Sequence, residues 1–547
     1  MYEQFRRTPP AIISYLLLSW EHTVFLAMQR FTMGGKEIRP HALFVAKRFR
    51  RLTPPPVNGK TVDRYDVCLD DECYAHASVS IVVSDGIGYY LVEEPPLDNL
   101  GIKALTEIMN YIYLNLSLEV LKNFSELKKE VFRAAEELGI RDVIDERIEA
   151  IWYYMLRETK YSLITIPVED PFVEDVELGH WRKPVTVVHR LYSDVIVPGG
   201  LFTNIVFSSE EEARSLVIRL GAKAGRSVNL ARPRLHASLP EGYRVAATLG
   251  VVSKGPTFSI RKFPQIPIVV TELIREGVLS PLMAAYFWLL NESRQFYIIV
   301  GASGVGKTTL LNALLMLSPP TWKIVVIEDV PEIIVSKEDD ASRPRIVRFL
   351  SNERVSAFEL ATDALRYRPD IIVVGEVRGR EIEALVRAVA SGAGSATTFH
   401  ASTPDEVMMA MRNLLPQDLF ALFISNMGSL AFIAKVFKSR EGRFVRRVLG
   451  VYELIDGNWC EVFKWIGEHD RHEPEDPEKV VEKSRAMKRA AAFLVMNLED
   501  ISKELAMRAK FLEKLSNELN YGTEVEKYQN FVNKIIEFYR RLWSGKK

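Results

Sequence analysis

The sequence has few cysteines, no long apolar run and no net charge, and each absence excludes a class of protein. Three cysteines among 547 residues are too few and too scattered for a disulfide framework, which favours a reducing cytoplasm. No segment reaches the roughly 18 apolar residues of a membrane span. The N-terminal candidate, Ile12–Leu18, is cut by Glu21 and lacks the features of a signal peptide. A formal net charge of zero provides no global field for nucleic acid or an anionic membrane.

Two of the cysteines, Cys68 and Cys73, lie close to His76. A zinc site needs a fourth ligand and usually a tighter cysteine pair. The alternative is a polar loop that leads into a strand, and both interpretations stay open here.

The chain is long enough for about three or four domains, and its 48% apolar and 26% charged residues are those of a globular protein. Between residues 268 and about 437, strand and helix patterns alternate, which predicts an α/β domain with a mostly parallel sheet. The strands expected there are Phe296–Val300, Ile324–Ile327, Ile371–Val374 and Ala396–Phe399. Strands are also expected upstream, among them Val185–His189, Ile205–Phe207 and Phe258–Ile260.

A glycine-rich loop separates the expected strand at Phe296–Val300 from a helix-forming run at Thr309–Leu315. The loop reads Gly301-Ala302-Ser303-Gly304-Val305-Gly306-Lys307-Thr308, a complete phosphate-binding motif. Strand, loop and helix in this order aim backbone N–H groups at a polyphosphate. Lys307 can reach the β- and γ-phosphates, and Thr308 can offer its hydroxyl to Mg²⁺. The sequence therefore predicts a nucleoside triphosphate site from Gly301 to Thr309, against the alternative of a glycine turn in an unrelated fold.

Acidic residues follow two later strands at the point where each strand ends. Glu328 and Asp329 come after one apolar run, and Glu376 follows a run of four β-branched residues and a glycine. Ligands of open α/β sheets sit at these carboxyl ends. Such carboxylates can position a water or approach Mg²⁺, partly through water. A solvated acidic turn remains the alternative for Glu328 and Asp329.

A histidine and an arginine complete the set of candidates. His400 ends the strand Ala396–Phe399 and could bond the γ-phosphate region. A lone histidine is usually structural, and only its place among the other elements favours a functional role. Arg378 could contact phosphate or pair with a carboxylate, and both interpretations remain open.

These four elements, in this order, resemble the secretion ATPases of type II and type IV secretion systems, a superfamily that also drives type IV pilus assembly and the archaellum. Its members carry a phosphate loop, an acidic box, a strand that ends in Gly-Glu and a histidine box. The run 364–370 before Gly375-Glu376 is close to the family signature. The resemblance covers residues 80 to 466 and extends weakly to 508–515. Segments Glu93–Leu97 and Arg446–Val448 resemble the archaeal branch.

The resemblance implies a RecA-like P-loop ATPase domain, preceded by a smaller α+β domain and an N-terminal helical and β region, and followed by a helical tail. The expected boundaries are 1–170 for the N-terminal region, 171–264 for the second N-domain (PAS-like in the family), 265–467 for the ATPase domain and 468–547 for the tail. The segment Phe263–Pro267 is the expected hinge.

The resemblance also implies a homo-hexamer that uses ATP and Mg²⁺. It implies catalytic roles for four residues, Lys307, Glu328, Glu376 and His400. It implies contacts with the metal for Thr308, Asp329 and Glu376. Arginines from the N-domain region reach the phosphates in this family, and the matching positions are Arg244 and Arg261; a surface arginine beside the hinge is the alternative for each. One departure is Ala393, which stands where many members have a second histidine.

Three functions are possible for a chain with these features. The favoured one is a cytoplasmic mechanical ATPase, peripheral at the inner face of the cell membrane, that drives assembly of a filament of pilin-like subunits through a polytopic membrane platform protein. The second is a nucleotide-dependent scaffold without productive turnover. The third is a nucleic-acid motor, which the neutral charge and the lack of an aromatic-basic stripe near the loop disfavour. No nucleic-acid partner is expected.

The last 80 residues carry apolar side chains at near-helical spacing, which predicts a helical bundle. The stripe includes Phe493, Leu498, Ile501, Leu505 and Leu512. Such a stripe is either the core face of the bundle or a docking face for a partner.

Overall fold

The structure is a computed structural model that describes residues 32–33, 36–37, 50–115, 124–193, 197, 199–263, 266–336, 345–352, 354–438, 443–521 and 523–545. Contacts divide the chain into two compact units, Met1–Phe263 and Pro264–Lys547. The apolar N-terminal segment Ile12–Leu18 and the hinge residues Pro264 and Gln265 lie outside the described residues.

The first unit contains one nine-stranded sheet within the described residues, with the order β3-β4-β5-β8-β7-β6-β11-β10-β9. Its strands are β3 (Lys60–Cys68), β4 (His76–Ser84), β5 (Ile87–Glu93), β6 (Val173–Leu178), β7 (Thr186–His189), β8 (Leu201–Thr203), β9 (Arg234–Ser238), β10 (Arg244–Thr248) and β11 (Thr257–Arg261). Its helices are α4 (Asn99–Asn115), α5 (Phe124–Glu137), α6 (Arg141–Asp145), α7 (Ile148–Thr159), η3 (Ser162–Ile164), α8 (Thr165–Glu169) and α9 (Glu210–Lys223). The strands β1 (Thr32–Met33) and β2 (Lys36–Glu37) form a separate short pair.

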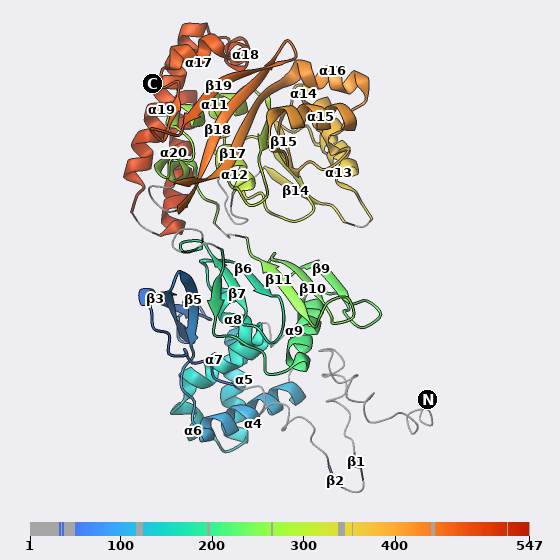
Figure 1. The fold of residues 1–547 in the computed structure, drawn as a ribbon, viewed down its shortest axis with the longest axis vertical. Helices are drawn as coiled ribbons and strands as arrows, with labels where there is room; N and C mark the ends of the chain where they lie inside the picture. The colour runs from blue at the N-terminus through green and yellow to red at the C-terminus, as the bar shows by residue number, and fades with distance from the viewer. Residues whose placement is uncertain are drawn as a thin grey trace. The chain divides into compact units, whose positions relative to one another are not determined.

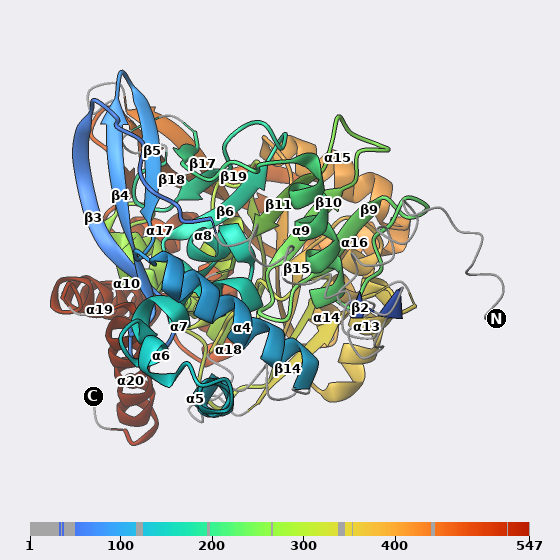
Figure 2. The ribbon, with the colours of Figure 1, turned by 90° about the horizontal axis from the view of Figure 1, so that it is seen from below.

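The domain boundary that we expected at residue 170 runs through this sheet. Strands β3 to β5 precede the boundary and β6 to β11 follow it, yet β5 pairs with β8 in parallel. Figure 2 shows the long strands β3, β4 and β5 side by side. One apolar core joins residues from both sides of residue 170. The strand expected at Ile205–Phe207 is also not seen; the pairing residues are Leu201–Thr203.

Two polar residues of the first unit, Glu94 and Asn204, have structural partners. Glu94 is buried and accepts hydrogen bonds from the Arg157 guanidinium at 2.8 Å and from the Tyr153 hydroxyl at 2.8 Å. Asn204 bonds both the N–H and the C=O of Val92 at 2.8 Å. These contacts satisfy buried polar groups and link strands, so the residues stabilise the fold of this unit.

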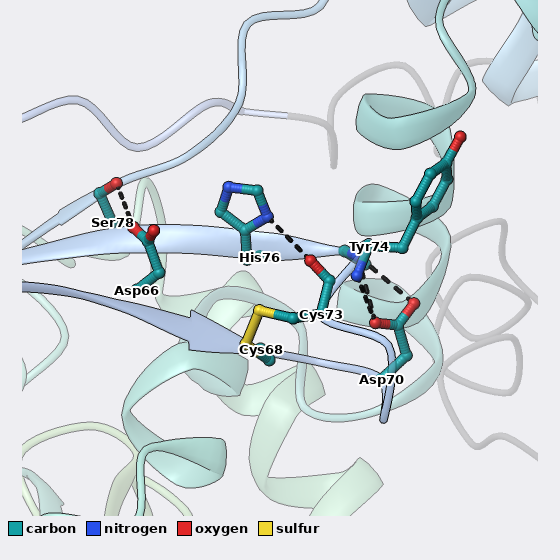
Figure 3. Close-up of a disulfide and its surroundings, with 8 residues drawn as sticks. Asp66, Cys68, Asp70, Cys73, Tyr74, His76 and Ser78 are labelled. Atoms are coloured by element: carbon teal, nitrogen blue, oxygen red, sulfur yellow. Dashed lines mark hydrogen bonds between the residues drawn. A yellow bond between two sulfur atoms is a disulfide. The ribbon is translucent and has the colours of Figure 1, made fainter.

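A disulfide joins Cys68 at the end of β3 to Cys73, a pairing that neither the metal-site nor the polar-loop interpretation included (Figure 3). The tight turn between them brings their Cα atoms to 4.7 Å, within the range that a disulfide spans. Asp70 holds the same turn by accepting hydrogen bonds from the N–H groups of Tyr74 and Ala75. No cluster of metal ligands occurs among the described residues, so the metal interpretation of this loop gains no support.

The second unit is built on a nine-stranded sheet of described residues, with the order β14-β13-β15-β16-β12-β17-β18-β19-β20. The strands are β12 (Phe296–Val300), β13 (Ile324–Glu328), β14 (Ile346–Leu350), β15 (Ile371–Glu376), β16 (Gly394–Phe399), β17 (Met427–Lys438), β18 (Arg443–Ile455), β19 (Asn458–Ile466) and β20 (Arg471–Glu473). Strands β12 to β17 pair in parallel, and β17 to β20 pair antiparallel. The mostly parallel, RecA-like sheet is therefore confirmed.

Helices cover both faces of this sheet (Figure 1). They are α10 (Val270–Arg275), α11 (Pro281–Glu292), α12 (Lys307–Leu315), α13 (Ala357–Ala364), η4 (Leu365–Tyr367), α14 (Glu381–Ala390), α15 (Pro404–Leu414), α16 (Gln417–Asn426), α17 (Pro477–Lys483), α18 (Arg485–Leu494), α19 (Leu498–Glu518) and α20 (Glu524–Trp543). One face packs against α10 to α12 and the tail, and the other packs against α13 to α16. Successive side chains of β12 and β15 point to opposite faces of the sheet, and both sets are buried, so these strands contribute to the apolar cores on both faces.

The helical tail belongs to the same core as α11. Ile501, Leu505 and Leu512 are fully buried, whereas Phe493 and Leu498 remain about half exposed. Arg508 of α19 is buried and donates to both carboxylate oxygens of Glu292 at 2.8 and 2.9 Å. The tail stripe is thus mainly a core face. No helix among the described residues has the length and apolarity needed to cross a membrane.

Candidate functional site

The phosphate-binding loop lies between β12 and α12, in the middle of the sheet. Gly304 and Gly306 have φ angles of 73° and 98°, which only glycine adopts without strain. Gly306 also precedes the first turn of α12, and no side chain caps that helix start. The N–H groups at the start of the helix are therefore available to an anion, as a phosphate site requires.

The two polar residues that end the loop point to neighbouring groups of the same site. Lys307 is buried, and its ammonium donates to the carbonyl of Ala302 at 2.8 Å. Burial lowers the pKa of Lys307, while the negative charges of Glu376 and Glu332 raise it. The hydroxyl of Thr308 lies 3.5 Å from a carboxylate oxygen of Glu332.

Glu332 is a candidate that the sequence reasoning missed. It follows Glu328 and Asp329 in the same turn, and only the fold shows that its carboxylate reaches Thr308. The sequence shows three acidic residues within five positions, Glu328, Asp329 and Glu332, but their spacing does not reveal which carboxylate faces the loop. The structure places Glu332 where a carboxylate can meet a metal ion or a water at the loop.

Glu328 has a more buried position than a solvated acidic turn. One of its carboxylate oxygens accepts hydrogen bonds from the backbone N–H groups of Glu332 at 2.9 Å and Ile333 at 2.7 Å. Its side chain contacts Gly375, where an added Cβ would lie 3.1 Å from the Glu328 Cγ. Burial raises the pKa of Glu328 to about 7, against the lowering effect of the two N–H groups. The observed contacts of Glu328 thus fix the turn that carries Glu332.

Arg378 joins the other two acidic candidates. Its guanidinium donates to Glu376 at 2.7 Å and to Asp329 at 3.0 Å. Two interpretations of Arg378 were open, contact with phosphate or pairing with a carboxylate. In the structure, Arg378 pairs with carboxylates. Glu376 follows directly on the buried part of β15, and Asp329 is half exposed.

His400 lies one residue beyond β16, at the same edge of the sheet, and is exposed. Its ring makes no hydrogen bond or ion pair within the described part of the chain. The threonines before it are structural, because Thr397 and Thr398 donate to the carbonyls of Val374 and Gly375 at 2.7 Å. Glu328, Glu376 and His400 thus stand at the carboxyl ends of β13, β15 and β16, which are neighbours in the sheet.

Arg244 and Arg261 belong to the first unit and lie directly opposite each other on β10 and β11. Arg261 also faces Asp175 of β6 and donates to it at 2.9 Å. The two arginines therefore share one face of the sheet at one end of three neighbouring strands.

Arg446 is a second residue, after Glu332, that the sequence reasoning did not place at the loop. It lies on β18, and an added Cβ at Gly306 would be 3.4 Å from its Cδ and 3.7 Å from its Nε. About 140 residues separate Arg446 from the loop in the sequence. The two meet because β18 pairs with β17 and β17 pairs with β12.

The chain is similar to several known proteins. Residues 231–432 match the family described as type II/IV secretion system protein. The protein MJ0900 of Methanocaldococcus jannaschii is 32% identical over 437 residues, which are 76% of this chain and 74% of that protein. MJ1287 of the same organism is 33% identical over 276 residues, 49% of this chain and 97% of that protein. The conjugal transfer protein TrbB of Rhizobium radiobacter is 29% identical over 226 residues, 40% of this chain and 68% of that protein.

Proposed function

The chain belongs to the type II/IV secretion system protein family, and we propose that it is an ATP hydrolase of that family. The observation that carries the proposal is the gathering of Lys307, Thr308, Glu332 and Glu376 around the phosphate loop. Phosphoryl transfer to water depends on positioning and charge stabilisation, and these residue types supply both.

The residues at the loop fit a nucleoside triphosphate with Mg²⁺. The uncapped start of α12 and the two left-handed glycines form a cradle for phosphate oxygens. Thr308 and Glu332 bring a hydroxyl and a carboxylate to one point, a donor set that suits a hard cation. Mg²⁺ bound there would neutralise charge on the β- and γ-phosphates.

Each side chain receives a role from its position. Lys307 binds the β- and γ-phosphates, and Thr308 would hold Mg²⁺ together with carboxylates of the acidic turn. Glu376 or Glu332 orients the attacking water, and Glu328 holds the turn in place through its two N–H contacts. His400 contacts the γ-phosphate region. The family resemblance, and not a contact in the structure, gives Arg244 and Arg261, cross-strand neighbours in the first unit, the role of supplying positive charge to the phosphates.

We further propose that the protein works as a homo-hexamer in the cytoplasm, peripheral at the membrane. Hydrolysis would move the two units of each subunit relative to each other. The motion would act through a polytopic membrane platform protein on a pilus-like filament or a secretion machine. The family membership supports this class of machine, and the division of the chain at residues 263 and 264 supports two moving parts.

The decisive experiment is steady-state phosphate release by the full chain with ATP and Mg²⁺. We expect Lys307→Ala to lose at least a hundredfold in rate, because one group that stabilises transition-state charge contributes about 10²–10³. The matched control is Lys503→Ala, an exposed lysine on α19 of the same unit. Normal hydrolysis by Lys307→Ala would refute the proposed site. ATP binding by the wild-type protein without turnover, in the presence of membrane partners, would favour the nucleotide-dependent scaffold.

A further inference from the structure

Strands β17 and β18 form a hairpin in which four large side chains share one face. Lys435 lies opposite Arg446, and Phe437 lies opposite Phe444. The two phenyl rings are 5.0 Å apart, and the Lys435 ammonium lies 5.1 Å from the centre of the Phe444 ring. These contacts place a cationic pair and an aromatic pair in sequence along the hairpin.

This face starts at the phosphate loop. Ile433, two residues before Lys435 on the same face, has its side-chain Cδ1 4.0 Å from the position that a Cβ on Gly306 would take. Arg446 lies against Gly306, the residue before the catalytic lysine. The aromatic pair is two residues further out, about 7 Å along the strands. The order from the loop outward is therefore phosphate cradle, cations and exposed rings.

The hairpin lies on the side of the loop away from the hydrolytic carboxylates. In the sheet order, β13, β15 and β16 lie on one side of β12, and β17 and β18 lie on the other. A triphosphate whose γ-phosphate faces Glu376 and Glu332 must direct its α-phosphate and its base away from them. Phe437 and Phe444 remain 56% and 38% exposed, although rings of this size are usually buried.

We propose that Phe437 and Phe444 form a stacking platform for the base of the bound nucleotide, and that Arg446 binds its α- or β-phosphate. This inference rests on the proposed function and adds to it the residues that hold the end of the nucleotide that is not hydrolysed. Stacking on an aromatic ring does not discriminate among bases, because every base has a π-face. The platform therefore predicts similar affinities for ATP and GTP.

The sequence shows no aromatic-basic stripe near the loop, but the hairpin brings aromatic and basic side chains together there in space. Its direct contact with the phosphate loop favours a single nucleotide over a strand of nucleic acid as the occupant.

The test is calorimetric binding of ADP and of inorganic tripolyphosphate to the full chain. Wild-type binding of ADP tests the proposed nucleotide site itself. We expect Phe437→Ala and Phe444→Ala to weaken ADP binding about tenfold, within the range for loss of one base stack, and to leave tripolyphosphate affinity unchanged. Phe444→Trp should retain ADP affinity.

Arg446→Ala should weaken ADP and tripolyphosphate alike, also about tenfold, because it removes a charged phosphate contact. The matched controls are Phe493→Ala, which removes an exposed ring far along the chain on α18, and Arg443→Ala, which removes a charge from the same hairpin. Both controls should bind ADP like the wild type.

Three outcomes would overturn the platform. If Phe437→Ala and Phe444→Ala both bound ADP as tightly as the wild type, the platform would be refuted and the nucleotide site would stand. An equal loss of ADP and tripolyphosphate in these variants would show that the rings support the loop rather than the base. In a parallel titration with single-stranded DNA, loss of DNA binding by these variants at unchanged ADP affinity would assign the face to nucleic acid. If the wild type bound neither ADP nor ATP, the proposed function would fail together with the platform.

Discussion

Glu328 provides the sharpest test of the acidic turn, because its burial makes both stability and activity predictable. The pKa of this carboxyl is raised from the ordinary 4.5 to about 7 by burial. A raised pKa means that the protonated form is favoured in the folded state, so the contribution to stability is fully present below pH 4.5. It is lost as the pH rises through about 7. At about 1.4 kcal/mol for each pKa unit, the loss amounts to about 3 kcal/mol.

Glu328→Gln removes this titration and keeps an oxygen that can accept from Glu332 and Ile333. The difference in unfolding free energy between variant and wild type, measured by urea denaturation, should therefore grow by about 3 kcal/mol between pH 4.5 and pH 8. Glu468→Gln, at an exposed position of the same unit, is the control and should show no such trend. A difference that stays constant over this pH range would refute the argument.

The same variant separates two roles for Glu328. If Glu328 only holds the turn, Glu328→Gln should change the rate of phosphate release only a few-fold. If Glu328 is the general base, the same change should lower that rate by about 10²–10⁴-fold. A loss of that size would return Glu328 to the catalytic role that the sequence suggested.

Four further predictions concern other parts of the chain. Arg508→Ala leaves Glu292 buried without its partner and should cost about 3–5 kcal/mol of stability, seen as a lower melting temperature in calorimetry; an unchanged melting temperature would contradict the buried pair. Gly301→Ala should weaken ADP binding and lower stability by about 1–3 kcal/mol, because the new Cβ would lie 2.2 Å from a carbonyl oxygen of β17. Alkylation of the unfolded protein without reductant should modify one of the three cysteines, since Cys68 and Cys73 are paired. Cys68→Ser with Cys73→Ser should cost at most about 2 kcal/mol in urea denaturation, because the bond closes a short loop, and should leave phosphate release unchanged.

Periodicity and motif order were sufficient for the central part of the second unit. The apolar runs at Phe296–Val300 and Ile371–Val374 appear as β12 and β15, and the glycine loop lies between strand and helix. These elements are buried on both faces, and long β-branched runs indicate such strands strongly. The loop chemistry followed because a phosphate cradle needs glycines at fixed positions.

What the sequence did not reveal depends on contacts between distant segments. Arg446 meets Gly306 only through the pairing of β18 with β17 and of β17 with β12. The orientation of Glu332 depends on the two N–H contacts that Glu328 accepts. The disulfide was missed because two cysteines five residues apart pair only if the turn between them is tight. Local patterns do not fix such geometry, because register and turn shape are set by the whole sheet.

The way the tail closes the core has a practical consequence for shortened forms of this chain. The family match ends at residue 432, six residues before β17 ends, whereas the apolar core continues into α20. A protein cut at that point would lose the outer half of β17 and its partner strands and would present Trp288 and neighbouring side chains of α11 to water. Such a fragment would carry a full phosphate loop and would still aggregate. The segment by which the family is recognised is therefore shorter than the smallest piece that can be expected to stay in solution.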